Sequence, residues 1–225
     1  MNSGTKATLI TVLVLAVLVG LYFYLTRPVA TSDTPVTPSE NLDTTSATQK
    51  KLNIVSAESS AQFTLNEDLR GKKTKVIGTT NQIAGEIIVD TKNPAEITIG
   101  EIKVDARTLK TDNEQRNGAL ARFILKTEET GNEYITFKST AVTDVPAVIT
   151  PNTPFNFSVV GYLTVRGSTK LVTFEATGVW KDDNSFSATA STTVAYADFG
   201  LSIPDLPFLA NVDKNTTLTV SVVAR

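Results

Sequence analysis

The stretch that decides the fold is Phe155-Asn-Phe-Ser-Val-Val-Gly-Tyr-Leu-Thr-Val-Arg-Gly-Ser-Thr-Lys-Leu-Val-Thr-Phe-Glu-Ala-Thr-Gly-Val-Trp180. Apolar residues and glycine recur at every second position from Phe155 to Val165, and again from Val172 to Trp180. A period of two is typical of a β-strand with one buried face. The short break at 166–168 therefore predicts a tight turn between two long antiparallel strands.

The same period continues on both sides of this hairpin. Further strands are expected over 61–65, 82–89, 97–104, 134–142, 186–194 and 218–224. The apolar residues have odd numbers before Gly100 (Ile97 and Ile99) and even numbers after it (Ile102 and Val104), which predicts a β-bulge there. In the strand from 134, we expect Ile135, Phe137 and Ala141 on one face. The charged segment 67–75 is interpreted as a loop.

Roughly eight strands joined mostly by short turns favour a meander, and strands longer than the usual ~5–6 residues favour a barrel over a sandwich. The sequence therefore predicts an all-β fold, an eight-stranded antiparallel β-barrel. The interior of such a barrel is either filled by side chains or just wide enough for one slender ligand. Small residues in the late strands favour a cavity, and they are Gly161, Gly178, Ser187, Ala188, Ala190 and Ser191.

One helix is predicted among the strands, over 111–125. Thr111 and Glu114 have the spacing of a capping box. Leu120, Phe123 and Ile124 follow at helical spacing, so we expect them to pack against the barrel rim. The helix lies in a connection between two strands and is expected to cover one mouth of the barrel.

The N-terminal part of the chain differs from the rest. Residues 1–7 form a short leader, and residues 8–25 carry no charge. As a helix the second segment would be ~27 Å long, which is close to the hydrocarbon thickness of a bilayer. A cleaved signal peptide is the alternative, but the apolar run is long and no small-x-small site precedes Arg27.

We therefore expect a single-pass transmembrane anchor of the signal-anchor type at 8–25, with the barrel on the extracytoplasmic side of the membrane. Residues 26–50 are rich in Thr, Ser and Pro, which predicts a disordered linker. The barrel domain is expected over 51–225.

The composition excludes several function classes. The 225 residues include no cysteine and no histidine, and the net charge is −2. Disulfides, thiol nucleophiles, histidine acid–base catalysis and most zinc or haem sites are therefore excluded. The negative charge makes nucleic acid a poor partner. No cofactor and no metal are predicted, and the oligomeric state is left open.

Several stretches together resemble the YceI-like family of lipid-binding barrels. They span most of 51–225 and are 59–63 (Ser-Ser-Ala-Gln-Phe), 85–90 (Gly-Glu-Ile-Ile-Val-Asp), 113–116 (Asn-Glu-Gln-Arg), 135–140 (Ile-Thr-Phe-Lys-Ser-Thr), 161–174 and 197–201 (Ala-Asp-Phe-Gly-Leu). The resemblance implies a lipocalin-like barrel that holds a long amphiphile, typically a polyisoprenoid, and no enzyme activity. The family often has an aromatic near Leu52 and a histidine near Glu58, so the ligand's identity stays open.

Two sets of residues are candidates for contact with such a lipid. The cavity lining is expected to include Phe63, Phe137, Phe157, Leu163, Phe174, Trp180 and Phe186, although the same residues could simply fill the barrel. Asn113, Arg116 and Arg122 on the helix are candidates for a polar head group, because arginine offers a fork of donors that suits phosphate or carboxylate. An ordinary ion pair of Arg116 with Asp112 is the alternative.

The sequence and the resemblance thus favour non-enzymatic binding of a polyisoprenoid-like lipid for storage, transport or presentation. A hydrolase working through carboxylates is one alternative, since that chemistry needs no histidine. A structural or adhesive ectodomain without a small ligand is another. The basic segment 70–75 could touch anionic lipid, or it could be a solvated loop.

Overall fold

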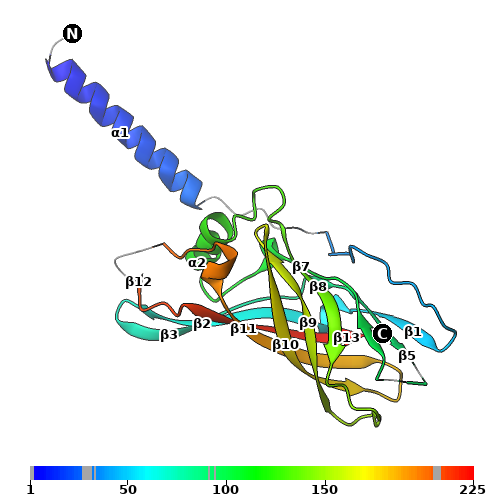
Figure 1. Cartoon of the computed structure of the whole chain (residues 1–225). Coiled ribbons are helices and arrows are strands. Elements are labelled where there is room, and N and C mark those ends of the chain that lie inside the picture. The colour runs from blue at the N-terminus through cyan, green and yellow to red at the C-terminus, as the bar shows by residue number, and fades with distance from the viewer. Residues whose placement is uncertain (1–2, 27–31, 33, 91, 94, 205–208) are drawn as a thin grey trace.

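A computed structural model of the chain describes residues 3–26, 32, 34–90, 92–93, 95–204 and 209–225. Figure 1 shows a long helix, α1 (Ser3–Thr26), leading to an elongated body of twisted strands. Within the part of the chain that is described, no helix has both the length and the apolar character needed to cross a membrane.

Eight antiparallel strands build a nearly closed barrel. In order around the wall, β2 (Ser60–Leu69) is followed by β13 (Asn215–Ala224), β11 (Phe186–Ala195), β10 (Ser168–Trp180), β9 (Phe155–Val165), β8 (Tyr134–Thr143) and β7 (Ile102–Asp105). The last place is shared by β3 (Lys72–Thr80), which pairs with β2, and its continuation β4 (Ile83–Ala84), which pairs with β7. The predicted eight-stranded lipocalin-like barrel is confirmed.

Two hairpins of this wall turn on the same dipeptide. Val165 pairs with Ser168 across Arg166-Gly167, and Leu69 pairs with Lys72 across Arg70-Gly71. All four turn residues have positive φ. Two-residue turns of this kind match the twist of the flanking strands. The expectation of a charged loop over 67–75 is wrong, because these residues continue two paired strands.

A second, three-stranded sheet branches from the barrel. It contains β1 (Gln49–Asn53), β5 (Glu86–Asp90) and β6 (Ile97–Ile99). The chain passes from the barrel into this sheet at Gly85 and returns at Gly100, whose N–H donates to the Glu86 carbonyl. The reversal of parity at Gly100 therefore marks a change of sheet, whereas a bulge was expected.

A bulge is found in β8 instead. Ser139 pairs with Gly161 and Ala141 with Val160, so Thr140 is the extra residue. An inserted residue moves later side chains to the other face. Ala141 is consequently exposed, and Val142 packs on the core in its place.

Part of the predicted linker lies against the domain. Residues 34–48 form no helix or strand, whereas 27–31 and 33 lie outside the described residues. Val36 is buried, and the Leu42 N–H donates to Glu86 Oε2 at 2.6 Å. Glu40 pairs with Lys138 at 2.6 Å. This segment, which we call the strap, runs along the body into β1.

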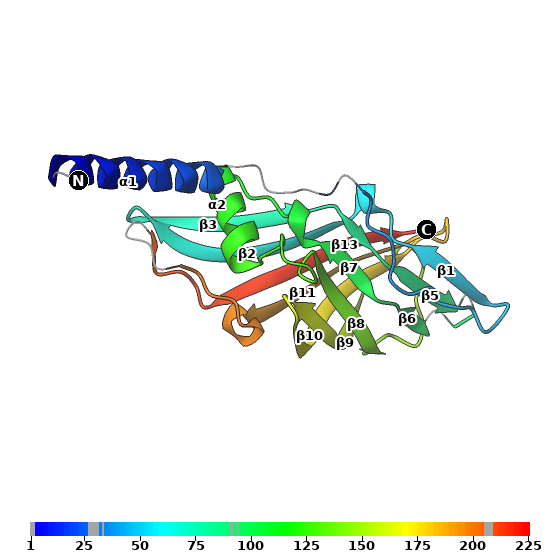
Figure 2. The same ribbon diagram turned by 90° about the horizontal axis from the view of Figure 1, so that it is seen from above.

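The segment between β7 and β8 covers one end of the barrel (Figure 2). It contains η2 (Ala106–Thr108), α2 (Glu114–Ala119) and the π-helical turn η3 (Leu120–Ile124). The short helix η4 (Tyr196–Phe199) closes the same end from the other side. The remaining elements are η1 (Ser56–Glu58) and the two-residue strand β12 (Leu209–Ala210).

Candidate ligand-binding site

The end of the barrel opposite the helices is filled by an aromatic plug. It consists of Phe155, Phe157, Trp180 and Phe186, which are 8%, 3%, 9% and 1% exposed. Their ring centroids lie 5.6 to 6.5 Å apart. Aromatic pairs at such distances pack as tightly as a protein core. This end therefore offers no space for a ligand.

The half of the interior next to α2 and η4, the mouth half, is different. Its inner face carries apolar side chains that are only half-buried, which are Phe63, Phe137, Val172, Val194 and Leu218. They pack against a smaller cluster that includes Leu163, Val165 and Phe199. Apolar side chains that point into a barrel and still meet solvent indicate an interior that is not filled.

Three glycines on the inner face lie under phenylalanine rings. A Cβ at Gly78 would stand 2.1 Å from the Phe63 ring, and one at Gly161 would stand 2.6 Å from Phe137. At Gly178 the rings of Phe157 and Phe186 would be 3.0 and 2.9 Å away. The space expected from Gly161 and Gly178 is thus occupied by aromatic neighbours. Ser187 and Ser191 are on the outer face of β11, so the other inward-facing small residues among those named are Ala188 and Ala190.

The cap over the mouth half is built from α2, η3 and η4. Asn113 is the N-cap of α2, because its side chain accepts from the Arg116 N–H at 3.0 Å. Thr111 was expected in that place, but its N–H and hydroxyl donate to Asn117 Oδ1. In η3 the Leu125 N–H donates to the Leu120 carbonyl, an i to i+5 bond.

This wide turn changes which residues face the barrel. Leu120 and Leu125 pack on the cluster around Phe199. Phe123, which was expected to pack there, is 43% exposed. Ile124 is half-buried, and its carbonyl accepts from Arg166 of the β9–β10 turn at 2.9 Å. The expected position of the helix at a barrel mouth is therefore found, with a different set of contacts.

The candidate head-group residues have partners of their own. Arg116 donates to Glu67 at 2.8 Å and to Asp112 at 2.7 Å. Glu67 is 7% exposed and lies on the inner parity of β2, so this ion pair joins the cap to the barrel interior. The guanidinium of Arg122 lies 6.0 Å from the Tyr24 ring. Asn113 is exposed.

All seven residues expected to line a cavity belong to the inner face, but in different regions. Phe157, Trp180 and Phe186 form the plug, whereas Phe63 and Phe137 lie in the mouth half. Leu163 is buried in the cluster of the mouth half, and Phe174 is buried with its ring edge-on to Phe137 at 5.1 Å. Their contact with a ligand stays a prediction. Val172, Val194, Leu218 and Glu67 were missed as site residues, although each continues the inward parity of its strand.

Two hollows are present in the surface near the mouth half. One of about 370 Å³ is bounded by β10, β11 and η4, with Val172, Val194 and Phe199 in its lining. The other, of about 520 Å³, is bounded by β2, β3, β11 and the start of β13, and its lining includes Lys75 and Lys214. Neither is lined by the seven predicted residues. The first hollow reaches the inner face and belongs to the mouth half.

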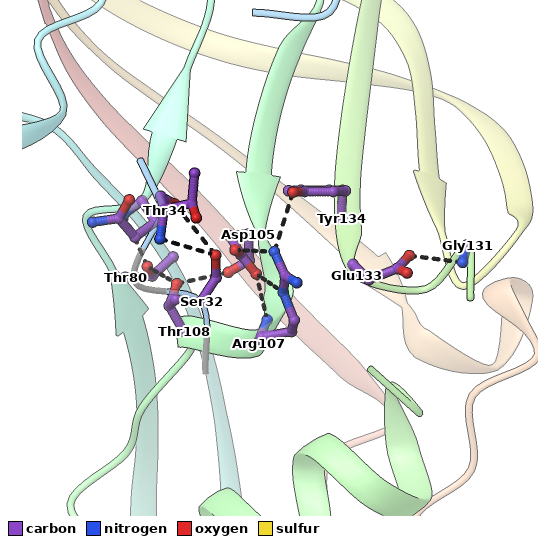
Figure 3. A network of polar contacts seen from close by, with 10 residues as sticks. Ser32, Thr34, Thr80, Asp105, Arg107, Thr108, Gly131, Glu133 and Tyr134 are labelled. Carbon is purple, nitrogen blue, oxygen red and sulfur yellow. Dashed lines mark hydrogen bonds and ion pairs between the residues drawn. The ribbon is translucent and has the colours of Figure 1, made fainter. Parts of the chain in front are cut away.

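The buried carboxylates serve the structure. Asp105 is fully buried and receives Arg107 Nε and Nη2 at 2.9 and 2.6 Å, and Arg107 also donates to the Tyr134 hydroxyl (Figure 3). The hydrogen bonds to Asp105 raise the pKa of Arg107. Lys51 Nζ lies 3.2 Å from Glu86 Oε1, and the Leu42 N–H of the strap donates to Glu86 Oε2. Each of these buried charges is therefore compensated.

The acidic pairs that could support a hydrolase do not form a site. Glu128, Glu129, Asp182 and Asp183 are exposed in turns, and Glu175 and Asp198 are also exposed. Among the residues that the structure describes, no group of three or more acidic side chains could hold a metal ion.

A nearly closed barrel with an apolar interior and a helical cap places the domain in the class of lipocalin-like β-barrels. The YceI-like domain model matches residues 52–224, and the chain belongs to this family. No curated protein matches the sequence.

Two solved structures share the fold. BcnA of Burkholderia cenocepacia is 15% identical, with a TM-score of 0.59 over 76% of this chain and 99% of its own. A polyisoprenoid binding domain from Saccharophagus degradans, implicated in plant cell wall breakdown, is 12% identical, with a TM-score of 0.59 over 77% and 97%.

Proposed function

We propose that this protein binds a long amphiphilic lipid of the polyisoprenoid type in the mouth half of its barrel. It would store, transport or present the lipid and catalyse no reaction. The family supports a binding role, and one neighbour of the same fold is a polyisoprenoid binding domain.

The single observation that carries the proposal is the change of burial along the inner face. The plug residues are buried, whereas Phe63, Phe137, Val172, Val194 and Leu218 stay half-exposed although they point inward. A lipid tail that covers these side chains would gain about 25 cal/mol for each Å² of apolar surface buried. No such gain is available to a barrel whose interior is already filled.

The membrane location is a separate part of the proposal. We propose that the N-terminal helix anchors the protein and that the barrel stands on the extracytoplasmic side. The support is the charge-free run 8–25 with Tyr22 and Tyr24 near its end, where aromatic residues gather at membrane interfaces. Retention of the full chain in the membrane fraction after alkaline washing, with the barrel accessible to protease only from outside, is the expected result.

The lipid-binding proposal is tested by filling the interior. The full chain is purified and incubated with a polyprenyl lipid, and bound lipid is counted by native mass spectrometry. Val194→Phe adds a ring on the inner face of the mouth half, where Val194 pairs with Thr216 and packs on the cluster around Phe199. We expect binding to weaken about tenfold, because excluding on the order of 60 Å² of ligand contact corresponds to about 1.5 kcal/mol.

Thr189→Phe is the matched control. Thr189 lies in the same strand, β11, and is exposed on the outer face beside Ser221. This variant should bind lipid like the unmodified chain. The proposal fails if the unmodified chain takes up no lipid, or if both variants bind equally well.

A further inference from the structure

The hairpin of β2 and β3 carries four cations at its tip. Arg70, Lys72, Lys73 and Lys75 are all exposed. Within the described part of the chain, none of the four forms an ion pair with a carboxylate. The tip is therefore a concentrated positive charge on a chain whose net charge is −2.

The acidic residues near this hairpin are directed elsewhere. Glu67 points inward and is paired with Arg116 at 2.8 Å. Asp68 accepts from the Asn211 amide at 2.7 Å. Asp213 accepts from the backbone and side chain of Asn66 at 2.9 and 2.8 Å. The cations at the tip thus keep their charge available for a partner.

The hairpin also presents an open strand edge with apolar neighbours. β3 pairs with β2 along its whole length, but its other side makes a single described bridge, from Thr79 to Lys110. Ile77 shares the outward parity of Lys73 and Lys75 and is 42% exposed. Basic side chains beside an exposed aliphatic one are typical of surfaces that lie on a membrane interface.

The position of the hairpin relates it to the barrel mouth. Figure 2 shows the β2–β3 tip projecting at the end where α2 caps the barrel and where α1 departs, whereas β1 and the C-terminus lie at the opposite end. Phe123 of η3, at the capped end, is 43% exposed. A partner bound by the tip would therefore lie next to the opening of the interior.

We propose that the β2–β3 hairpin is a docking surface for an anionic lipid membrane, which it binds through Arg70, Lys72, Lys73 and Lys75. The lysines lie against the lipid phosphates, and the barrel mouth is held at the membrane surface. The proposal goes beyond lipid binding in the interior and does not depend on it.

The test measures lysine reactivity in the full chain. An amine-acetylating reagent is applied with no vesicles, with phosphatidylcholine vesicles, and with vesicles in which about one third of the lipid is phosphatidylglycerol. Modified lysines are located by mass spectrometry. We expect Lys72, Lys73 and Lys75 to be protected by the anionic vesicles alone, and the protection to disappear in high salt, which screens surface charges.

Lysines at the opposite end of the barrel provide the internal control. Lys50 lies in β1, Lys92 follows β5 and Lys181 follows Trp180 of the plug, and all three should react equally in the three samples. Interior lipid is counted separately, so the two proposals can fail independently.

Two charge variants complete the test. Because the chain has no cysteine, Ile77→Cys can carry a single environment-sensitive fluorescent label on the hairpin. Its emission should shift to the blue on anionic vesicles, and the shift should be largely lost when K72Q, K73Q and K75Q are added. It should be kept when K50Q, K92Q and K181Q, which remove the same charge from the far end, are added instead. Equal shifts in these two backgrounds would overturn the proposal. So would unchanged lysine reactivity with anionic vesicles, which would make the hairpin a solvated edge protected by lysines. The proposal would also be overturned if these lysines were protected by an added acidic protein but not by anionic vesicles.

Discussion

Single side chains decide how much of the barrel is hollow. Gly161 is on the inner face of β9, and its sequence position alone indicates space. The Phe137 ring takes up that space, as the Phe63 ring does at Gly78. A small residue in a barrel strand therefore has to be read together with the residue opposite it on the next strand.

Gly161→Ala is expected to destabilise the protein. A Cβ there would lie 2.5 Å from the Lys138 carbonyl oxygen and 2.6 Å from the Phe137 ring, so backbone and ring must both move. We expect a loss of about 1–3 kcal/mol in the free energy of unfolding, measured by denaturant titration.

Gly118→Ala is the control for this substitution. Gly118 lies inside α2, where its Cβ would meet only the flexible end of Arg122 at 3.2 Å. Alanine in a helix is favoured over glycine by roughly 0.5–1 kcal/mol, so this variant should be as stable as the unmodified chain or more so. A loss as large as that of Gly161→Ala would contradict the packing described.

The C-terminal residue provides a pH-dependent contact. Arg225 donates two hydrogen bonds to Glu58, and these lower the pKa of Glu58 below its ordinary value of 4.5. A carboxylate with a lowered pKa stabilises the folded state above its unfolded pKa, and this contribution is lost as the pH falls through the folded value.

A double-mutant cycle with Glu58→Gln and Arg225→Gln should therefore show a coupling in the free energy of unfolding at neutral pH. The coupling should decline below about pH 4.5 and vanish once Glu58 is protonated in both states. The absence of any coupling at pH 7, or a coupling unchanged down to pH 3, would contradict an ion pair that depends on ionised Glu58.

At the scale of elements, the cap shows why helical spacing predicts the wrong exposure for Phe123 and does not single out Leu125 as buried. Leu120, Phe123 and Ile124 fit one face of a regular helix, in which each residue turns about 100°. The i to i+5 bond from Leu125 to Leu120 widens the turn and rotates the following residues. Phe123 then faces outward, and Leu125 takes the inward place.

Leu125→Ala should accordingly cost about 2–5 kcal/mol of unfolding free energy, since Leu125 is 6% exposed in the cluster under the cap. Phe123→Ala should change stability by less than about 0.5 kcal/mol, as expected for an exposed side chain. Thermal and denaturant unfolding of the two variants distinguish this arrangement from a regular helix, for which the order would be reversed.

For the whole molecule, the strands with strong period-two patterns were predictable from sequence. Examples are Phe155–Val165 and Phe186–Ala195, where one face is buried and the other meets solvent. β3 was missed because Lys72, Lys73 and Lys75 stand on an open edge, where charge and not burial determines the residue types. The bulge at Thr140 and the change of sheet at Gly100 depend on pairing with distant strands, which local periodicity does not contain.

The candidate site was predictable in part. The inner parity identified all seven apolar residues, but not which of them fill the barrel and which remain accessible. That difference arises from ring-to-ring contacts among Phe155 and Phe157 of β9 and Phe186 of β11, two strands that are not neighbours in the wall. The pairing of Arg116 with Glu67 joins elements 49 positions apart in the chain and likewise has no local signal.

The aromatic plug closes one end of the barrel, so the interior can be entered only from the other end. A lipid bound as proposed would enter tail first and leave by the same route, with its polar group at the entrance. From Val165 to Phe157 the strand measures roughly 26 Å at about 3.3 Å per residue, and because barrel strands tilt from the barrel axis, the depth that limits the enclosed tail is somewhat less. In a series of polyprenyl lipids, affinity measured by native mass spectrometry should rise with chain length up to that depth and then level off.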